Sequence, residues 1–216
     1  MLSTILEPKH WPAGEGKIIL TFDDGPNPNI SISNQLLDVL KSHQIPATFC
    51  YIGRNIKKHP AIVKRAIDEN HSVAYHTYSH TPWPLLSKKR LLHETDKTQK
   101  LFKTITKAHN KSPKLFRPPW GIVTPAVKHL LKELSLDTAY LTFFISEAWS
   151  DPASGKQKMD QIKKRLLKNK GGAIVLHENC HSVSIDKSWL PDAVENLILW
   201  AKEHQLTFTS YDTKRI

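Results

Sequence analysis

The chain has 216 residues, of which 39% are hydrophobic and 8% aromatic, and its formal net charge is +11. This length and composition are typical of one globular domain over residues 1–216 and exclude a largely disordered chain. There is no run of eighteen apolar residues, so no transmembrane segment is expected, and the N-terminus shows no secretory signal pattern. We therefore expect a cytoplasmic protein, or an extracytoplasmic one if a leader is missing from the sequence. Nothing in the sequence predicts the oligomeric state.

The positive charge comes mainly from lysine and would attract anionic polymers. Arginine, which reads bases and phosphates better than lysine, is scarce, and the lysines are spread along amphipathic segments such as 156–170. We therefore expect solvated helix faces and no specific nucleic-acid partner. Cys50 ends an apolar run and is expected to be a buried thiol, while Cys180 is interpreted as a bystander rather than a metal ligand.

Short segments rich in β-formers alternate with longer segments of helical periodicity along the whole chain. The expected strands are 17–22, 47–52, 72–75, 115–116, 138–145, 173–176 and 206–209. The expected helices are 32–42, 61–69, 88–107, 125–134, 159–167 and 190–202. This order predicts parallel strands with helices outside them. Because chemically active residues follow several different strands, the pattern favours a barrel, and a doubly wound sheet stays the alternative.

Two adjacent carboxylates, Asp23 and Asp24, end the first expected strand. Neighbouring strand side chains point to opposite faces, so one carboxylate can bind a cation while the other accepts a proton. The alternative is a polar Asp-Gly-Pro turn without chemistry.

His76 and His80 directly follow the third expected strand, at a spacing that we expect to place both imidazoles on one side of a helical turn. A chance pair is the alternative, since the chain has twelve histidines. Two imidazoles and one carboxylate would leave coordination positions open for water and substrate, as a catalytic metal requires.

Arg117 opens a stiff Arg-Pro-Pro-Trp-Gly loop and, if held near two aspartates, would keep one of them ionised. A surface arginine in an ordinary connector is the alternative. His177 follows the apolar strand 173–176, where it is either a core histidine or a general acid at a barrel mouth.

Four segments in this order resemble the motifs of the polysaccharide deacetylase (NodB-homology) family. They are Thr-Phe-Asp-Asp-Gly-Pro at 21–26, His-Thr-Tyr-Ser-His at 76–80, Arg-Pro-Pro-Trp-Gly at 117–121 and Leu-His at 176–177. The resemblance implies a TIM-like, distorted (β/α) barrel with seven parallel strands and outer helices. It also implies a divalent metal, usually Zn²⁺, with Co²⁺, Mn²⁺ or Ni²⁺ as alternatives.

The resemblance implies a role for each residue that matches a motif. Asp24, His76 and His80 would bind the metal. Asp23 would be the general base, and Arg117 would orient it.

On the other side of the site, the resemblance makes His177 the general acid. The backbone N–H of Trp120 would help to bind the oxyanion. Trp149 and Leu176 would form the apolar wall for the acetyl methyl group.

One motif departs from the family pattern, in which Asp-x-x-Asp-Trp precedes the last active-site strand. Here Ala148 stands where the aspartate before Trp149 would be. Either Glu147 or Asp151 substitutes for that aspartate, or His177 lacks its support and is a less effective general acid.

The expected reaction is removal of N-acetyl groups from amino-sugar glycans of the chitin oligosaccharide or peptidoglycan type, by metal-activated water with an Asp base and a His acid. One alternative is a relative that acts on another amide or ester, such as a formamido sugar, a lipid-linked sugar or an O-acetylated glycan. Another is a non-catalytic binder of anionic glycan or nucleic acid, against which the intact catalytic and ligand residues argue.

Overall fold

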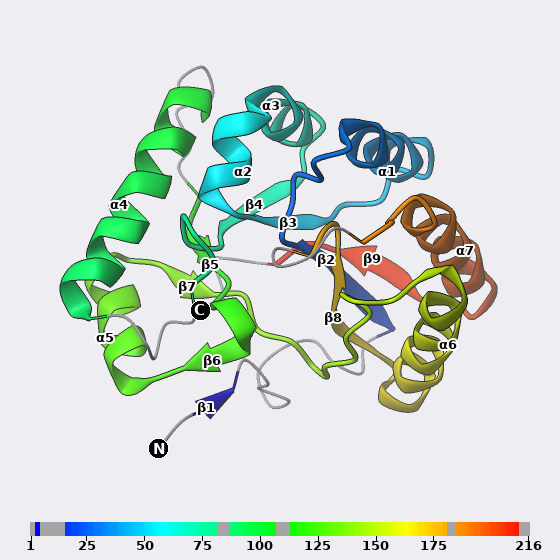
Figure 1. Cartoon of the computed structure of the whole chain (residues 1–216). Helices are drawn as coiled ribbons and strands as arrows, with labels where there is room; N and C mark the ends of the chain where they lie inside the picture. The colour runs from blue at the N-terminus through cyan, green and yellow to red at the C-terminus, as the bar shows by residue number, and fades with distance from the viewer. Residues whose placement is uncertain (1–2, 5–15, 82–86, 107–112, 181–184, 212–216) are drawn as a thin grey trace.

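The computed structural model describes residues 3–4, 16–81, 87–106, 113–180 and 185–211. Seven strands form one curved sheet in which all pairs are parallel (Figure 1). They are β2 (Lys17–Asp23), β3 (Thr48–Tyr51), β4 (Ser72–Tyr75), β5 (Leu115–Phe116), β7 (Asp137–Thr138), β8 (Gly171–His177) and β9 (Thr207–Thr209). Their order is β7–β5–β4–β3–β2–β8, and β9 pairs with β2.

Helices cover the outer side of the sheet (Figure 1). They are α1 (Ile30–Ser42), α2 (Gly53–Lys58), α3 (Pro60–Asp68), α4 (Lys88–Ile105), α5 (Pro125–Glu133), α6 (Pro152–Asn169) and α7 (Leu190–Glu203). A small antiparallel pair, β1 (Ser3–Thr4) with β6 (Ile122–Val123), lies apart from the main sheet. Among the described residues, no helix has both the length and the apolar character needed to cross a membrane.

Side chains alternate along each strand between the helix-covered face and the inner face of the curved sheet. On β2, Ile18, Leu20 and Phe22 belong to the large core cluster under the helices, whereas Ile19 belongs to a second, smaller cluster. The smaller cluster gathers inward-facing residues of several strands: Ile19, Cys50, Ala74, Leu115, Ala139, Ala173 and Tyr211. Cys50 is fully buried there, as expected.

The predicted barrel with seven parallel strands and outer helices is confirmed. Its two end strands, β7 and β8, are connected by the segment that follows β7. Thr142 N–H donates to Ala173 O at 2.9 Å, and Ala173 N–H donates to Thr142 Oγ1 at the same distance. The curved sheet therefore surrounds most of an interior that opens at the carboxyl ends of its strands.

Three elements differ from the expectation. The strand expected at 138–145 is only Asp137–Thr138, because the chain then leaves the ladder and bonds to β8 through a threonine side chain. Helix α6 begins at Pro152, seven residues earlier than expected, because the Asp151 side chain caps it by accepting from Ser154 N–H. Helix α2 was not expected, and its six residues are too short to show a clear periodicity.

Candidate active site

The chemically active side chains lie at the carboxyl ends of four parallel strands. Asp23 is the last residue of β2 and His177 the last of β8, and the two are register partners. His76 and Arg117 directly follow β4 and β5, and Arg117 N–H donates to Tyr75 O at 2.8 Å. Because parallel strands end on one edge, segments far apart in sequence meet here.

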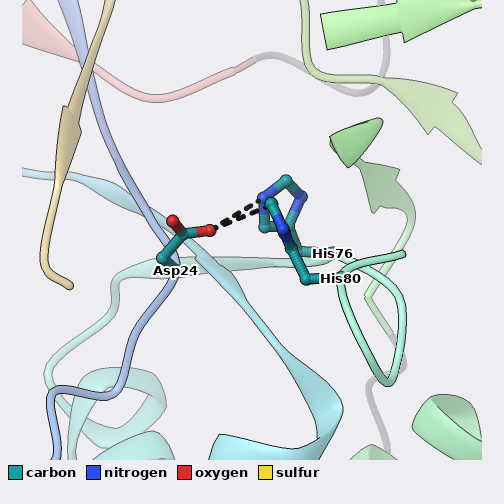
Figure 2. A group of neighbouring side chains, drawn as sticks. All are labelled: Asp24, His76 and His80. Atoms are coloured by element: carbon teal, nitrogen blue, oxygen red, sulfur yellow. Dashed lines mark ion pairs between the residues drawn. The ribbon is translucent and has the colours of Figure 1, made fainter. Parts of the chain in front are cut away.

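Asp24, His76 and His80 form a buried cluster with the atoms of a metal site (Figure 2). Asp24 Oδ1 lies 3.4 Å from His76 Nε2 and 3.1 Å from His80 Nε2. One ligand atom from each side chain lies within 4.8 Å of the other two. The structure thus brings together the three ligands that the sequence predicts, and Cys180 is not among them.

Hydrogen bonding prepares these side chains for a cation. His76 Nδ1 lies 2.7 Å from Arg117 O, and since a carbonyl only accepts, Nδ1 carries the proton. With Nδ1 as its N–H donor, His76 would present the Nε2 lone pair to a cation bound beside Asp24, which is the usual arrangement of a ligand histidine. Burial would raise the pKa of Asp24, but the hydrogen bond of His76 and the charge of His80 keep that pKa well below its usual range. An ionised carboxylate with two imidazoles is a donor set that suits zinc and similar divalent ions.

The predicted helical turn at 76–80 is wrong, because these residues form a loop. Thr77 and His80 both have φ near +60°, in the left-handed region, and Asp24 has φ +67°. His80 N–H donates to Thr77 Oγ1 at 2.9 Å, which closes the loop on itself. Non-glycine residues in this region each cost on the order of 1–3 kcal/mol, so surrounding contacts must hold the loop.

Those contacts come from α4 and α2, neither of which was expected to contribute to the site. The Glu94 carboxylate on α4 accepts from Tyr78 N–H at 3.1 Å and from Ser79 N–H at 2.8 Å. The first residues of α2 donate to the same loop, Gly53 N–H to Thr77 O at 2.9 Å. Asn55 Nδ2, also on α2, donates to Asp24 O at 2.9 Å.

Asp23 lies beside the cluster and is fixed by Arg117. One guanidinium nitrogen, Nη1, donates to both Asp23 carboxylate oxygens, at 3.3 and 3.2 Å. Arg117 is itself buried and held by Ala139 O through Nε at 2.8 Å and by Thr21 Oγ1 through Nη2 at 3.1 Å. The Asp23 carboxylate is therefore held by Arg117 beside the cluster, with Oδ2 3.9 Å from His76 Nε2.

On the other side, Glu147 supports His177. Its Oε2 lies 2.8 Å from His177 Nδ1, and its Oε1 accepts from His177 N–H at 2.6 Å. Since a carboxylate only accepts, Nδ1 carries the proton and Nε2 is left for chemistry. Of the two residues expected to substitute for the missing aspartate, Glu147 contacts His177, whereas Asp151 caps α6.

This pairing sets the charge of the imidazole. Burial would lower the pKa of His177, but the charge and hydrogen bond of Glu147 outweigh it and raise the pKa to about 9. The same pair keeps the pKa of Glu147 below its usual value, although burial opposes this. The contact with Glu147 therefore favours the protonated form of the His177 imidazole.

Two exposed tryptophans flank the ligands. Trp120 is 49% exposed, with its ring 6.0 Å from that of His80 and 6.2 Å from that of Trp149, which is 54% exposed. Leu176 does not lie with them. It is fully buried in the large core cluster, on the face of β8 opposite to His177, so its placement does not support the expected role in the acetyl wall.

Comparisons with known proteins identify the family. The polysaccharide deacetylase family model matches residues 11–139. A peptidoglycan-N-acetylglucosamine deacetylase of Bacillus cereus is 30% identical over 201 residues, covering 92% of this chain and 88% of that protein. The peptidoglycan-N-acetylmuramic acid deacetylase PdaC of Bacillus subtilis is 33% identical over 161 residues, covering 74% of this chain and 32% of that protein.

Among solved structures, the Bc1960 peptidoglycan N-acetylglucosamine deacetylase is similar with a TM-score of 0.75 and 26% identity, over 92% of this chain and 87% of that one. The family model covers more than half of the chain, and the Bacillus cereus relative matches it almost from end to end. With a parallel sheet that brings its four motif segments together at one edge, the chain belongs to the polysaccharide deacetylase family.

Proposed function

We propose that this protein is a metal-dependent hydrolase that removes N-acetyl groups from amino-sugar glycans of the peptidoglycan or chitin oligosaccharide type. One observation carries the proposal: a buried Asp24–His76–His80 cluster lies at the same strand ends as a carboxylate oriented by Arg117 and a histidine paired with Glu147. The relatives' names, which include peptidoglycan N-acetylglucosamine and N-acetylmuramic acid deacetylases, support the substrate class.

The three ligands would hold one divalent cation, and we propose Zn²⁺ from the mixed nitrogen and oxygen donors. Such a cation polarises a carbonyl oxygen and makes water more acidic. The fit rests on the buried ligand atoms, on the tautomer fixed by Arg117 O, and on the ionised Asp24.

The chain's own residues supply the proton transfers. Asp23, held by Arg117, accepts a proton from the attacking water as the water adds to the amide carbon. His177, held protonated by Glu147, then donates from Nε2 to the departing sugar nitrogen. Trp120 and Trp149 offer exposed aromatic faces to the substrate beside this centre, and the N–H of Trp120 is proposed as an oxyanion donor.

Acetate release tests the proposal. Metal-stripped and zinc-reloaded protein are compared on N-acetylglucosamine oligomers, peptidoglycan fragments and acetylated xylan, with Asp23→Asn as the inactive control. We expect zinc-dependent release from at least one of the two N-acetylated substrates. Release from acetylated xylan alone would make the protein an O-deacetylase, and no release from any substrate would overturn the proposal.

A further inference from the structure

Lys187 is a buried cation that belongs to none of the motifs behind the family resemblance. Its side chain is fully buried, and it lies in the segment before α7. Lysine is almost never fully buried unless its charge is paired, because removing an ammonium group from water is costly. The partner of this ammonium group therefore indicates what the residue does.

That partner is Glu147, the carboxylate behind His177. Lys187 Nζ donates to the backbone oxygen of Glu147 at 2.7 Å and lies 3.7 Å from Glu147 Oε1. The ammonium group also lies 5.1 Å from the centre of the Trp189 ring. Trp189 packs tightly against Gly155 of α6, where an added Cβ would meet the ring at 2.7 Å. The lysine is thus held from both sides and cannot easily turn away.

The contacts form a line of three charged groups that ends at the reacting nitrogen. Lys187 contacts Glu147, and Glu147 contacts His177 through both oxygens. A carboxylate alone holds the proton of an imidazolium strongly, which orients the acid but slows its release. A cation on the far side of the carboxylate weakens that hold without moving the carboxylate.

We propose that Lys187 is a positioning residue for deacetylation, which fixes Glu147 behind His177 and balances its negative charge. This inference rests on the proposed function. In this chain Ala148 stands where the family pattern has an aspartate, and Lys187 is the second contact, besides His177, that holds Glu147.

Other charged groups also act on the pKa values of His177 and Lys187. His177 is influenced by Glu147, Asp24 and Asp23, and Lys187 by Glu147, Cys180 and Asp24. Burial lowers the pKa of Lys187, and Glu147 opposes that change. The aspartates are present in both the wild type and any Lys187 variant. A difference in His177 titration between these proteins is therefore due to the lysine.

The test compares Lys187→Met with the charge-preserving Lys187→Arg and with the control Lys163→Met. Lys163 also lies over a tryptophan ring, that of Trp200 at 5.8 Å, but on α6 away from Glu147. Acetate release of the zinc-reloaded proteins is measured against pH, and the His177 imidazole is titrated by NMR in the metal-stripped proteins. Bound zinc and thermal unfolding are recorded for each variant.

For Lys187→Met we expect the alkaline limb of kcat and the NMR titration of His177 to move up by at least about 0.5 pH units, because a positive neighbour of its carboxylate is lost. We also expect kcat to fall roughly threefold to tenfold, with zinc content unchanged. Lys187→Arg should recover most of both effects, and Lys163→Met should show neither. An unchanged profile and an unchanged titration in folded Lys187→Met would overturn the inference.

If Lys187→Met does not fold, the double variant Glu147→Gln/Lys187→Met, which removes both charges, is compared with Glu147→Gln. The inference predicts that the two His177 titrations differ by less than about 0.5 pH units, because the lysine acts mainly through the glutamate. A larger difference between the two variants would contradict it. A failure of the proposed function can be distinguished from a failure of this inference. In the first case the wild type would release no acetate, while the NMR titration of His177 would still show the effect of Lys187.

Discussion

The two sides of the active site are built differently. On the ligand side, Asp24, His76 and His80 contact one another directly, and all three belong to family motifs. On the acid side, His177 depends on Glu147 and Lys187, neither of which belongs to a matching motif. The residues proposed to bind the metal and transfer protons therefore lie in recognisable motifs, as does Arg117, whereas Glu147 and Lys187 do not. The predictions below test this division.

The largest effect is expected from Asp23→Asn. The amide keeps the shape of the side chain but cannot accept the proton of water, so kcat should fall about 100-fold to 10,000-fold. Acetate release and bound zinc are measured together, and zinc should remain, because Asp23 is not a ligand. Wild-type turnover in this variant would show that Asp23 is not the base.

Glu147→Gln tests the acid side. Without the carboxylate, the pKa of His177 should fall from about 9 towards its ordinary value, and the alkaline limb of kcat should move to lower pH. We expect kcat at pH 8 to fall about tenfold to 100-fold while zinc stays bound. Asp151→Asn, at the helix cap that was the other sequence candidate, is the matched control. An equal loss of kcat in Glu147→Gln and Asp151→Asn would show that Glu147 has no special role in supporting His177.

Glu94→Gln tests the support of the ligand loop. Its carboxylate accepts from two backbone N–H groups of the strained loop between His76 and His80. A weaker acceptor should loosen the ligands and lower zinc affinity about tenfold, measured by competition with a chelator. Glu133→Gln, on the exposed surface of α5, should leave affinity unchanged. A loss of turnover with unchanged affinity would contradict this account of Glu94.

Glu178 directly follows His177, and the effect expected from this residue is on stability and not on catalysis. Its N–H donates to Asp23 O at 3.0 Å, and its carboxylate accepts from Asn27 N–H at 3.2 Å. Burial raises the pKa of Glu178 from 4.5 to about 7, so the folded state binds this proton more tightly than the unfolded state. This contribution to stability is present below pH 4.5 and is lost as the pH rises to about 7.

Glu178→Gln should remove that loss. Between pH 5 and pH 8, the free energy of unfolding should therefore fall by on the order of 2 kcal/mol less in this variant than in the wild type. Urea unfolding at the two pH values measures the difference, with exposed Glu203→Gln as the control. A wild-type pH dependence in Glu178→Gln would show that other groups cause it.

The sequence predicted the sheet well because its strands are apolar runs with polar residues at their carboxyl ends, as in β2 and β8. The strand expected at 138–145 was wrong because threonines and aromatics suit a strand, while Thr142 bonds to Ala173 with one backbone and one side-chain hydrogen bond instead of a continuous ladder. The ligand set was predicted from motif order, but not its loop conformation, since the left-handed Thr77 and His80 depend on Glu94 and α2.

Supporting residues were the hardest to predict. Lys187 is one of many lysines in a basic chain, and only its burial against Glu147 distinguishes it. Leu176 was assigned by its neighbour in a motif, although alternation along a strand places adjacent residues on opposite faces. Because His177 was expected to face the site, the same alternation would have placed Leu176 on the opposite face from sequence alone.

The most direct test of the central claim is a zinc titration of metal-stripped protein, with acetate release from an N-acetylglucosamine oligomer followed at each step. We predict that activity rises in proportion to zinc and stops at one equivalent, and that His80→Ala neither binds this equivalent nor becomes active. Full activity before any zinc is added, or an active His80→Ala with zinc bound, would contradict a catalytic cation held by Asp24, His76 and His80.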